Sequence, residues 1–182
     1  SPTSICVGGI ATITASGATT YTWMPGSLSG ATVTVSPATT TIYTITGTST
    51  LTCPGTRTIS LIVNPTPTLT AVSNPVAICV GGSATLTSSG ATTYTWMPGS
   101  LTGATVTVSP VVTTIYTVTG SNGTCSSTRT VQTTVNTPPT VTASASSSTV
   151  CAGTSLTLTA GGATTYTWMP GSLTGATVAV TP

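Results

Sequence analysis

One stretch of the sequence occurs three times, almost letter for letter, and each copy begins Gly-Ala-Thr-Thr-Tyr-Thr-Trp-Met-Pro-Gly. The copies occupy residues 17–37, 90–110 and 162–182. All three tryptophans and all three methionines of the protein lie within them. A segment that recurs with its largest side chains at fixed places is typical of the core of a structural unit that is repeated along a chain.

The spacing between matching residues defines the length of this unit. Trp23 and Trp96 are 73 positions apart, and Trp96 and Trp168 are 72 apart. A unit of this length is close to the lower limit for an independent hydrophobic core. We therefore expect three domains, repeats 1, 2 and 3, at residues 1–65, 66–138 and 139–182. Repeat 1 is expected to lack its first strand, and repeat 3 to stop before its last two strands.

Large apolar residues alternate with threonine inside each copy. Tyr21 and Trp23 share one face of an extended segment, while Thr20 and Thr22 lie on the other. This alternation predicts short, half-buried antiparallel strands, and no stretch has the apolar period of a helix.

In repeat 2 the expected strands are 66–72, 83–88, 92–97, 104–109, 114–120 and 128–136, with a short segment at 76–80. About seven short strands with a tryptophan on the third indicate an immunoglobulin-like sandwich. The expected fold class is therefore all-β, with tandem immunoglobulin-like sandwiches, two of them nearly complete and one truncated.

Charged residues are almost absent. Of 182 residues, two are arginines, and none is Asp, Glu, Lys or His. Soluble surfaces usually carry roughly a quarter of their residues as charged side chains. An uncharged, threonine-rich surface is expected to associate through strand edges unless something covers it. We therefore expect packing against copies of the same chain, a coat of sugar on Ser and Thr, or both.

The linkers between the units are short and rich in proline. They are Asn64-Pro-Thr-Pro67 and Asn136-Thr-Pro-Pro139. Such linkers are stiff, so neighbouring units should be held in line as a rod. Because both ends of the sequence fall inside a unit, we expect further repeats to continue the rod covalently.

The five cysteines favour an oxidising compartment, so we expect an extracellular or cell-surface location. No apolar run approaches the roughly 18 residues of a membrane span. The start of the sequence also lacks a basic segment followed by an apolar one, as a secretion signal would have. The chain is thus expected to be a mature protein or a fragment.

Several short motifs lie within the tryptophan stretch or beside it, and close variants of them occur in more than one repeat. Among them are Ile-Cys-Val-Gly-Gly-x-Ala-Thr-Leu-Thr, Tyr-Thr-Trp-x-Pro-Gly and Thr-x-Tyr-Thr-Val-Thr-Gly. With these motifs the whole chain resembles the immunoglobulin-like tandem repeats of very large secreted surface proteins and adhesins of Bacteroidetes-type bacteria. The resemblance implies a stalk, an adhesin or a gliding-associated surface fibre rather than an enzyme. The chain departs from such repeats in having no carboxylate, the ligand that calcium prefers.

The cysteines occupy matching places in the repeats. Cys6 and Cys79 precede the second expected strand, and Cys53 and Cys125 lie between the last two. Because each nearly complete repeat has one cysteine of each kind, we expect the disulfides Cys6–Cys53 and Cys79–Cys125, each stabilising by roughly 4 kcal/mol. The partner of Cys151 would lie beyond the end of the sequence. The cysteines are not clustered, so no metal site is expected.

The recurring aromatic residues have two interpretations. The pairs are Tyr21 and Trp23, Tyr94 and Trp96, and Tyr166 and Trp168. Their position on the apolar face favours rings packed between the two sheets. The alternative is a platform that binds sugar.

Arg57 and Arg129 also occupy matching places, at the inward parity of the last expected strand. With no carboxylate in the chain, each guanidinium must use carbonyl groups, an aromatic ring or an external anion. We expect a rim position in which the guanidinium covers an aromatic side chain. Two arginines do not form the basic surface of a nucleic acid-binding protein.

The residue types needed for catalysis are missing. Without His, Asp, Glu or Lys the hydroxyl groups have no base to activate them, so we expect no enzyme activity and no cofactor. The leading hypothesis is a structural stalk or fibre outside a bacterial cell, coated with O-linked sugar. The alternatives are an adhesion module that binds glycan or protein through loops at one domain end, and a passive carrier of O-glycans. Asn122 also heads a match to the N-glycosylation sequon.

Overall fold

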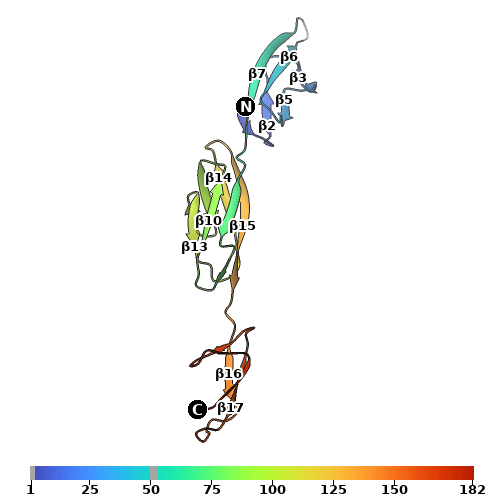
Figure 1. The fold of residues 1–182 in the computed structure, drawn as a ribbon. Helices are drawn as coiled ribbons and strands as arrows, with labels where there is room; N and C mark the ends of the chain where they lie inside the picture. The colour runs from blue at the N-terminus through green and yellow to red at the C-terminus, as the bar shows by residue number, and fades with distance from the viewer. Residues whose placement is uncertain (1–2, 50–52) are drawn as a thin grey trace.

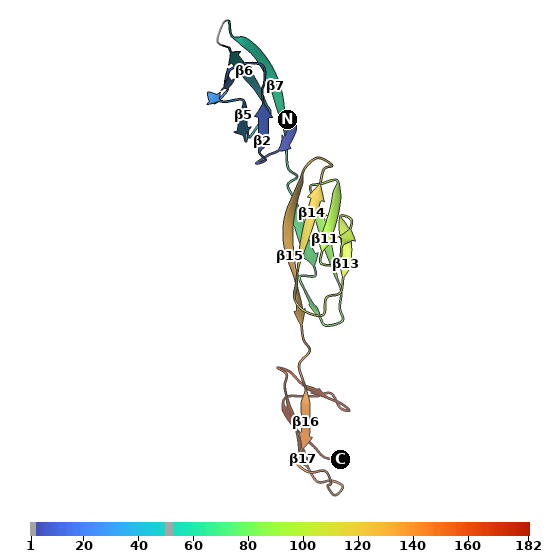
Figure 2. The same ribbon diagram turned by 180° about the vertical axis from the view of Figure 1, so that it is seen from behind.

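The computed structural model describes residues 3–49 and 53–182, and these residues form strands joined by turns, with no helix among them. Figures 1 and 2 show the three repeats one after another along a line, in the order of the sequence. A single extended segment leads from each repeat into the next. The molecule is therefore elongated, with contacts between repeats restricted to their ends.

Repeat 2 has the fullest set of strands. They are β8 (Thr70–Asn74), β9 (Ala77–Cys79), β10 (Ala84–Ser89), β11 (Thr93–Met97), β12 (Leu101–Thr102), β13 (Thr105–Val108), β14 (Thr114–Ser121) and β15 (Ser126–Asn136). One sheet has the order β13-β10-β8 and the other β12-β11-β14-β15-β9. All paired neighbours are antiparallel except β15 and β9, which run parallel. Two packed sheets with this order and a tryptophan on the third main strand form an immunoglobulin-like sandwich.

The alternation of side chains decides which face of each strand is buried. In β10, Ala84, Leu86 and Ser88 are buried, and the residues between them are more exposed. In β11, Tyr94 and Trp96 are the buried residues. The inner faces of both sheets contribute to one core, which contains Leu69, Ile78, Ala84, Leu86, Tyr94, Trp96, Val108, Tyr116 and Val118.

Two details of repeat 2 differ from the expected strands. β12 has only two residues, too few to show an alternation in the sequence, and it extends the edge of β11. The first strand begins at Thr70 rather than at Thr66, because Pro65 and Pro67 have no N–H to donate to a ladder.

Repeat 1 has the same two layers with fewer strands. Its strands are β1 (Ser4–Cys6), β2 (Ala11–Thr14), β3 (Thr20–Met24), β4 (Leu28–Ser29), β5 (Thr32–Val35), β6 (Thr41–Thr48) and β7 (Gly55–Asn64). The larger sheet has the order β1-β7-β6-β3-β4, and β2 pairs with β5 in the other. The described part of the chain has no counterpart of β8 in repeat 1, so the smaller sheet has two strands where repeat 2 has three. Its core contains Ala11, Ile13, Trp23, Val33, Val35, Tyr43 and Leu61.

Repeat 3 has all three strands of the smaller sheet, of which the described part of repeat 1 has only two. Its strands are β16 (Thr142–Ala145), β17 (Leu156–Gly161), β18 (Thr167–Trp168), β19 (Leu173–Thr174) and β20 (Thr177–Val180). The first sheet has the order β16-β17-β20, and the second consists of β18 and β19 alone. The sequence of repeat 3 contains no counterparts of β14 and β15, so Tyr166 and Trp168 are only half-buried.

Candidate functional site at the junction of repeats 1 and 2

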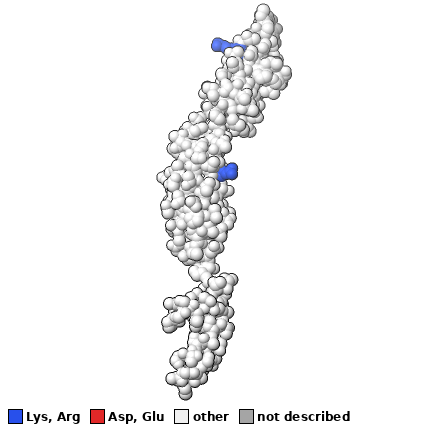
Figure 3. Space-filling view, viewed as in Figure 1, with Lys and Arg blue, Asp and Glu red and all other residues white. Residues whose placement is uncertain are grey.

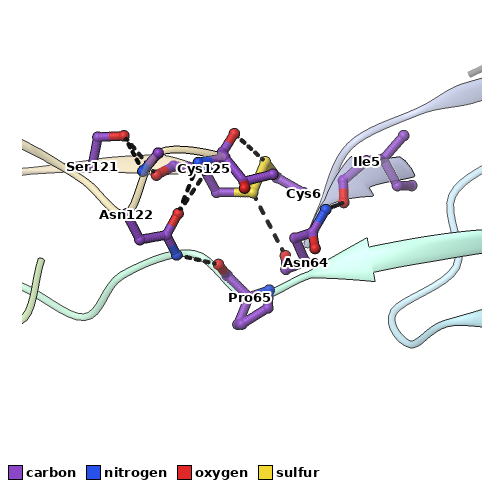
Figure 4. Close-up of a disulfide and its surroundings, with 9 residues drawn as sticks. Ile5, Cys6, Asn64, Pro65, Ser121, Asn122 and Cys125 are labelled. Atoms are coloured by element: carbon purple, nitrogen blue, oxygen red, sulfur yellow. Dashed lines mark hydrogen bonds between the residues drawn. A yellow bond between two sulfur atoms is a disulfide. The ribbon is translucent and has the colours of Figure 1, made fainter. Parts of the chain in front are cut away.

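The junction of repeats 1 and 2 brings together segments that are far apart in sequence. On the side of repeat 1 it contains the end of β1, which pairs in parallel with the end of β7 so that Cys6 lies beside Asn64. On the side of repeat 2 it contains the turn between β14 and β15. Figure 4 shows this turn lying against Cys6 and the linker that follows β7.

A disulfide joins the two repeats at this place. It links Cys6 to Cys125, across 119 positions of sequence, with a Cα–Cα distance of 5.8 Å. The expected pairs Cys6–Cys53 and Cys79–Cys125 are therefore wrong, and Cys53 and Cys79 are free and exposed. Cys151 is also an exposed free thiol.

The length of the last strand explains why the expected pairing fails. Cys6 lies beside the end of β7, whereas Cys53 lies just before its start, and β7 has ten residues. Ten residues of strand span about 30 Å, which is far beyond the Cα separation of about 4.4 to 6.8 Å that a disulfide bridges. The same holds in repeat 2, where Cys79 lies beside the end of β15 and Cys125 precedes its start. Repeats 1 and 2 thus each have their two cysteines at opposite ends.

Hydrogen bonds hold the β14–β15 turn against the linker. The side-chain oxygen of Asn122 accepts hydrogen bonds from the backbone N–H groups of Thr124 and Cys125, at 3.2 and 2.9 Å. Its amide nitrogen donates to the carbonyl oxygen of Pro65 at 3.3 Å, and the hydroxyl of Ser127 donates to the carbonyl oxygen of Pro67. The side chain that heads the N-glycosylation sequon is therefore engaged on both of its polar atoms.

The disulfide sulfurs lie close to carbonyl groups on both sides of the junction. Sγ of Cys6 is 3.7 Å from the carbonyl oxygen of Thr124, and Sγ of Cys125 is 3.8 Å from that of Asn64. These are van der Waals contacts, because a disulfide sulfur has no proton to donate. Cys125 is buried, with 2% of its surface exposed. The cross-link is thus packed into the interface and does not hang outside it.

The aromatic pairs lie inside the sandwiches of repeats 1 and 2. Trp23 and Trp96 have 2% and 0% of their surface exposed, and Tyr21 and Tyr94 have 9%. In all three repeats the indole N–H donates to a glycine carbonyl seven residues later, at 2.9 to 3.0 Å. Neither tryptophan of these two repeats offers an exposed face on which a sugar could stack.

Arg57 and Arg129 are exposed, as the two blue patches in Figure 3 show. They lie opposite Ile45 and Val118 in the register of the last two strands. Arg57 also lines, together with Tyr21 and Trp23, a cavity of about 420 Å³ at the end of repeat 1 far from the junction.

This cavity corresponds to a place that a strand fills in repeat 2. There Leu69, which precedes β8, is buried in the core and lies against Gly120. The matching Gly47 lines the cavity in repeat 1, where the described residues include no counterpart of Leu69. The cavity therefore lies where Leu69 packs in repeat 2. Its lining residues include no carboxylate or imidazole.

The described residues contain neither a group of three or more potential metal ligands nor a helix long and apolar enough to cross a membrane. Burial raises the pKa of the Tyr116 hydroxyl above its ordinary value of 10.0.

No family model matches the chain, and neither does any curated protein sequence. Solved structures with a similar arrangement include an amphioxus IgVJ-C2 molecule, at 17% identity over 72% of this chain and 99% of that one, with a TM-score of 0.33. Murine CEACAM1b matches at 11% identity over 74% of this chain and 96% of that one, with a TM-score of 0.34. The immunoglobulin-like assignment rests on the sheet order and register of the chain itself.

Proposed function

We propose that this chain is a structural module of an extracellular stalk or fibre, in which immunoglobulin-like repeats are fixed end to end. The observation that supports this most is the junction of repeats 1 and 2. Domains joined by a linker alone move relative to one another by default. Here a linker, a disulfide and the hydrogen bonds of Asn122 and Ser127 connect the same two ends. Such a joint resists bending and twisting.

The disulfide supports a location outside the cell, and the residue composition supports a role without catalysis. A disulfide persists in an oxidising compartment, which fits a secreted or surface-attached protein. The sequence has no His, Asp, Glu or Lys to serve as a base, which supports a non-enzymatic role without a cofactor. The resemblance to repeats of Bacteroidetes-type surface proteins points the same way. The proposed partners are further copies or a continuation of the same repeat chain.

The surface is proposed to carry O-linked sugar. Figure 3 shows one face that is uncharged except for two arginines, which is far from the usual composition of a soluble surface. Sugars on exposed Thr and Ser would supply the missing solvation and keep strand edges apart. The intact mass of material from the native source should then exceed the 17.7 kDa of the polypeptide. A soluble protein at the polypeptide mass would contradict the glycan coat.

An adhesion module that binds glycan or protein through loops at the domain ends is the alternative. The β14–β15 turn is such a loop, and in repeat 2 it is occupied by the linker and by Cys6. Loops used in this way are not free for a partner, which favours the structural role.

The rigid junction can be tested by nuclear magnetic resonance in solution. Residual dipolar couplings of repeats 1 and 2 in the oxidised chain should fit one common alignment tensor, because the two repeats tumble as one body. The Cys125→Ser variant should need two tensors, while Cys151→Ser, which removes a free thiol away from this junction, should leave the fit unchanged. Independent tensors for repeats 1 and 2 in the oxidised parent chain would overturn the proposal.

A further inference from the structure

We propose that Cys79 and Cys53 each form a further disulfide with a cysteine of a neighbouring repeat. In each such bond, the cysteine at the end of the parallel edge strand of one repeat joins the hairpin cysteine of the repeat that follows it. The partner of Cys79 is thus a hairpin of the kind formed by β14 and β15. This inference deepens the proposed end-to-end assembly and rests on it, and the experiment below separates the two.

Cys79 has the same backbone surroundings as Cys6. Cys6 is the last residue of β1 and lies beside Asn64, and Cys79 is the last residue of β9 and lies beside Asn136. In both places the N–H of the third residue after the cysteine donates to the cysteine carbonyl, at 2.8 and 2.9 Å. The next valine donates to the carbonyl of the neighbouring asparagine, at 3.0 and 3.1 Å. The two thiols are therefore presented at the same end of their repeats in the same way.

The connection from repeat 2 to repeat 3 also has the same length as the connection from repeat 1 to repeat 2. Thr68 and Thr140 each come four residues after the last strand of the preceding repeat. The carbonyl oxygen of Thr68 lies 1.9 Å from the position of a Cβ on Gly90, and that of Thr140 lies at the same distance from one on Gly162. The segment that leads into the first strand thus approaches the same glycine in both repeats. Because the connection between repeats has the same length at both junctions, we infer that a hairpin on repeat 3 would face Cys79 as the β14–β15 turn faces Cys6.

The exposed positions of Cys79 and Cys53 fit this arrangement. Cys79 is exposed, and the described strands of repeat 3, β16 to β20, include no hairpin of the β14–β15 kind. Cys53 is the counterpart of Cys125 and lies on the hairpin side of repeat 1, also exposed. Its partner is the edge-strand cysteine of a repeat placed before it. Cys151 is the counterpart of Cys79 in repeat 3.

The bond forms by ordinary thiol–disulfide exchange with a disulfide oxidant such as oxidised glutathione. The hairpin thiolate attacks the oxidant, forms a mixed disulfide and releases one thiolate. The Cys79 thiolate then displaces the second one and forms the inter-repeat S–S bond. The two cysteines lose two protons and two electrons in total, and the oxidant is reduced to two thiols.

Digestion with trypsin can identify which cysteines are paired, because the two arginines divide the chain into three fragments. Cleavage after Arg57 and Arg129 gives the fragments 1–57, 58–129 and 130–182. With thiols blocked and no reductant, the parent chain should yield 1–57 bonded to 58–129 and a separate 130–182. Pairing within each repeat would release all three fragments, and that result would contradict the rigid junction of the proposed function.

The inference itself is tested on a longer chain refolded with oxidised and reduced glutathione. Residues 111–136 are appended after Pro182, the counterpart of Pro110, so that repeat 3 gains its last two strands and a hairpin cysteine. Trypsin also cuts after the appended copy of Arg129 and releases a short peptide that has no cysteine. The other three fragments should remain in one disulfide-bonded species, and Cys79→Ser in the longer chain should release the third of them. If the third fragment is released without that substitution, the inference fails while the junction of repeats 1 and 2 stands.

A second extension makes the result independent of how repeat 3 folds. Residues 66–145 placed before Ser1 supply repeat 1 with a first strand and with a preceding repeat. The added copy of Cys79 should then bond to Cys53, so that the first tryptic fragment stays attached to the next one. Cys53→Ser should release that first fragment. A free Cys53 thiol in this folded chain would contradict the inference for Cys53, whatever the result for Cys79.

Discussion

At the scale of single residues, three glycines at the same place in the recurring stretch have different neighbouring atoms. Gly17, Gly90 and Gly162 occupy the same place in the recurring stretch, and all have φ between 91° and 100°. At Gly90 and Gly162 a Cβ would collide with a backbone carbonyl, whereas at Gly17 it would meet nothing within 4 Å. The glycine therefore serves two purposes, a left-handed turn and room for the first strand, and only the first applies in the described part of repeat 1.

Alanine at these positions separates the two purposes. Gly17→Ala should cost about 1 to 2 kcal/mol, the strain of a left-handed conformation. Gly90→Ala should cost more, because β8 must also shift, and amide hydrogen exchange should speed up throughout the pairing of β8 with β10. The matched variant Gly17→Ala should leave the exchange of β2 and β5 nearly unchanged. Equal effects of the two substitutions would mean that the carbonyl contact is unimportant.

At the scale of elements, β8 is fastened to the opposite sheet by one buried polar pair. The hydroxyls of Ser73 and Thr133 lie 2.8 Å apart, with 2% and 0% of the residue surfaces exposed. Ser73 also donates to the carbonyl oxygen of Pro75 at 3.0 Å, so the Thr133 hydroxyl donates to Ser73. In repeat 1 the counterpart of Thr133 is Leu61, which is fully buried without any hydroxyl.

Removing one partner of this pair should cost more than removing both. Ser73→Ala leaves the buried Thr133 hydroxyl without an acceptor and should destabilise repeat 2 by about 1 to 3 kcal/mol. Adding Thr133→Val should recover part of that loss, because an apolar residue is tolerated there in repeat 1. Urea denaturation of the two single variants and the double variant gives the coupling energy. Strict additivity would show that the two hydroxyls do not depend on each other.

The strands of repeat 2 were largely predictable, while the junction was not. Alternation of threonine with Leu86, Tyr94 and Trp96 specifies strand and inner face from adjacent residues alone. The disulfide depends on which end of a sandwich meets which end of the next one. The length of the strand at 128–136 argues against pairing within a repeat only once the structure shows that Cys79 lies beside its far end. The contact of Asn122 with Pro65 could not be predicted either, since nothing in the sequence places a turn against a linker 57 positions away.

At the scale of the whole molecule, the sequence removes the usual causes of acid denaturation. Acid unfolds proteins mainly by protonating carboxylates and histidines that the fold keeps unprotonated, and this chain has no such side chain. The free energy of unfolding should therefore be flat between about pH 3 and pH 7, as urea titrations at several pH values would show. A steep fall in that range would contradict this account.

The alkaline side should behave differently because of Tyr116. Burial raises the pKa of its hydroxyl above 10.0, so the folded state keeps the neutral phenol while the unfolded state ionises. The stability that this provides is complete below pH 10.0 and is lost as the pH rises through the folded-state pKa. With thiols blocked, Tyr116→Phe should make the fall in unfolding free energy above pH 10.0 shallower. An unchanged fall would assign it to other groups.

The Cys6–Cys125 bond also decides how far the protein can stretch. A force that pulls on the two ends passes from Cys6 directly to Cys125, so the 119 positions between them carry no load even when repeat 1 unfolds. At about 3.3 to 3.6 Å per residue, roughly 400 Å of chain is held in reserve behind one covalent bond. As long as the bond is oxidised, the segment between the two cysteines therefore adds no length to the pulled chain, and a reductant would release that segment as a long, compliant tether.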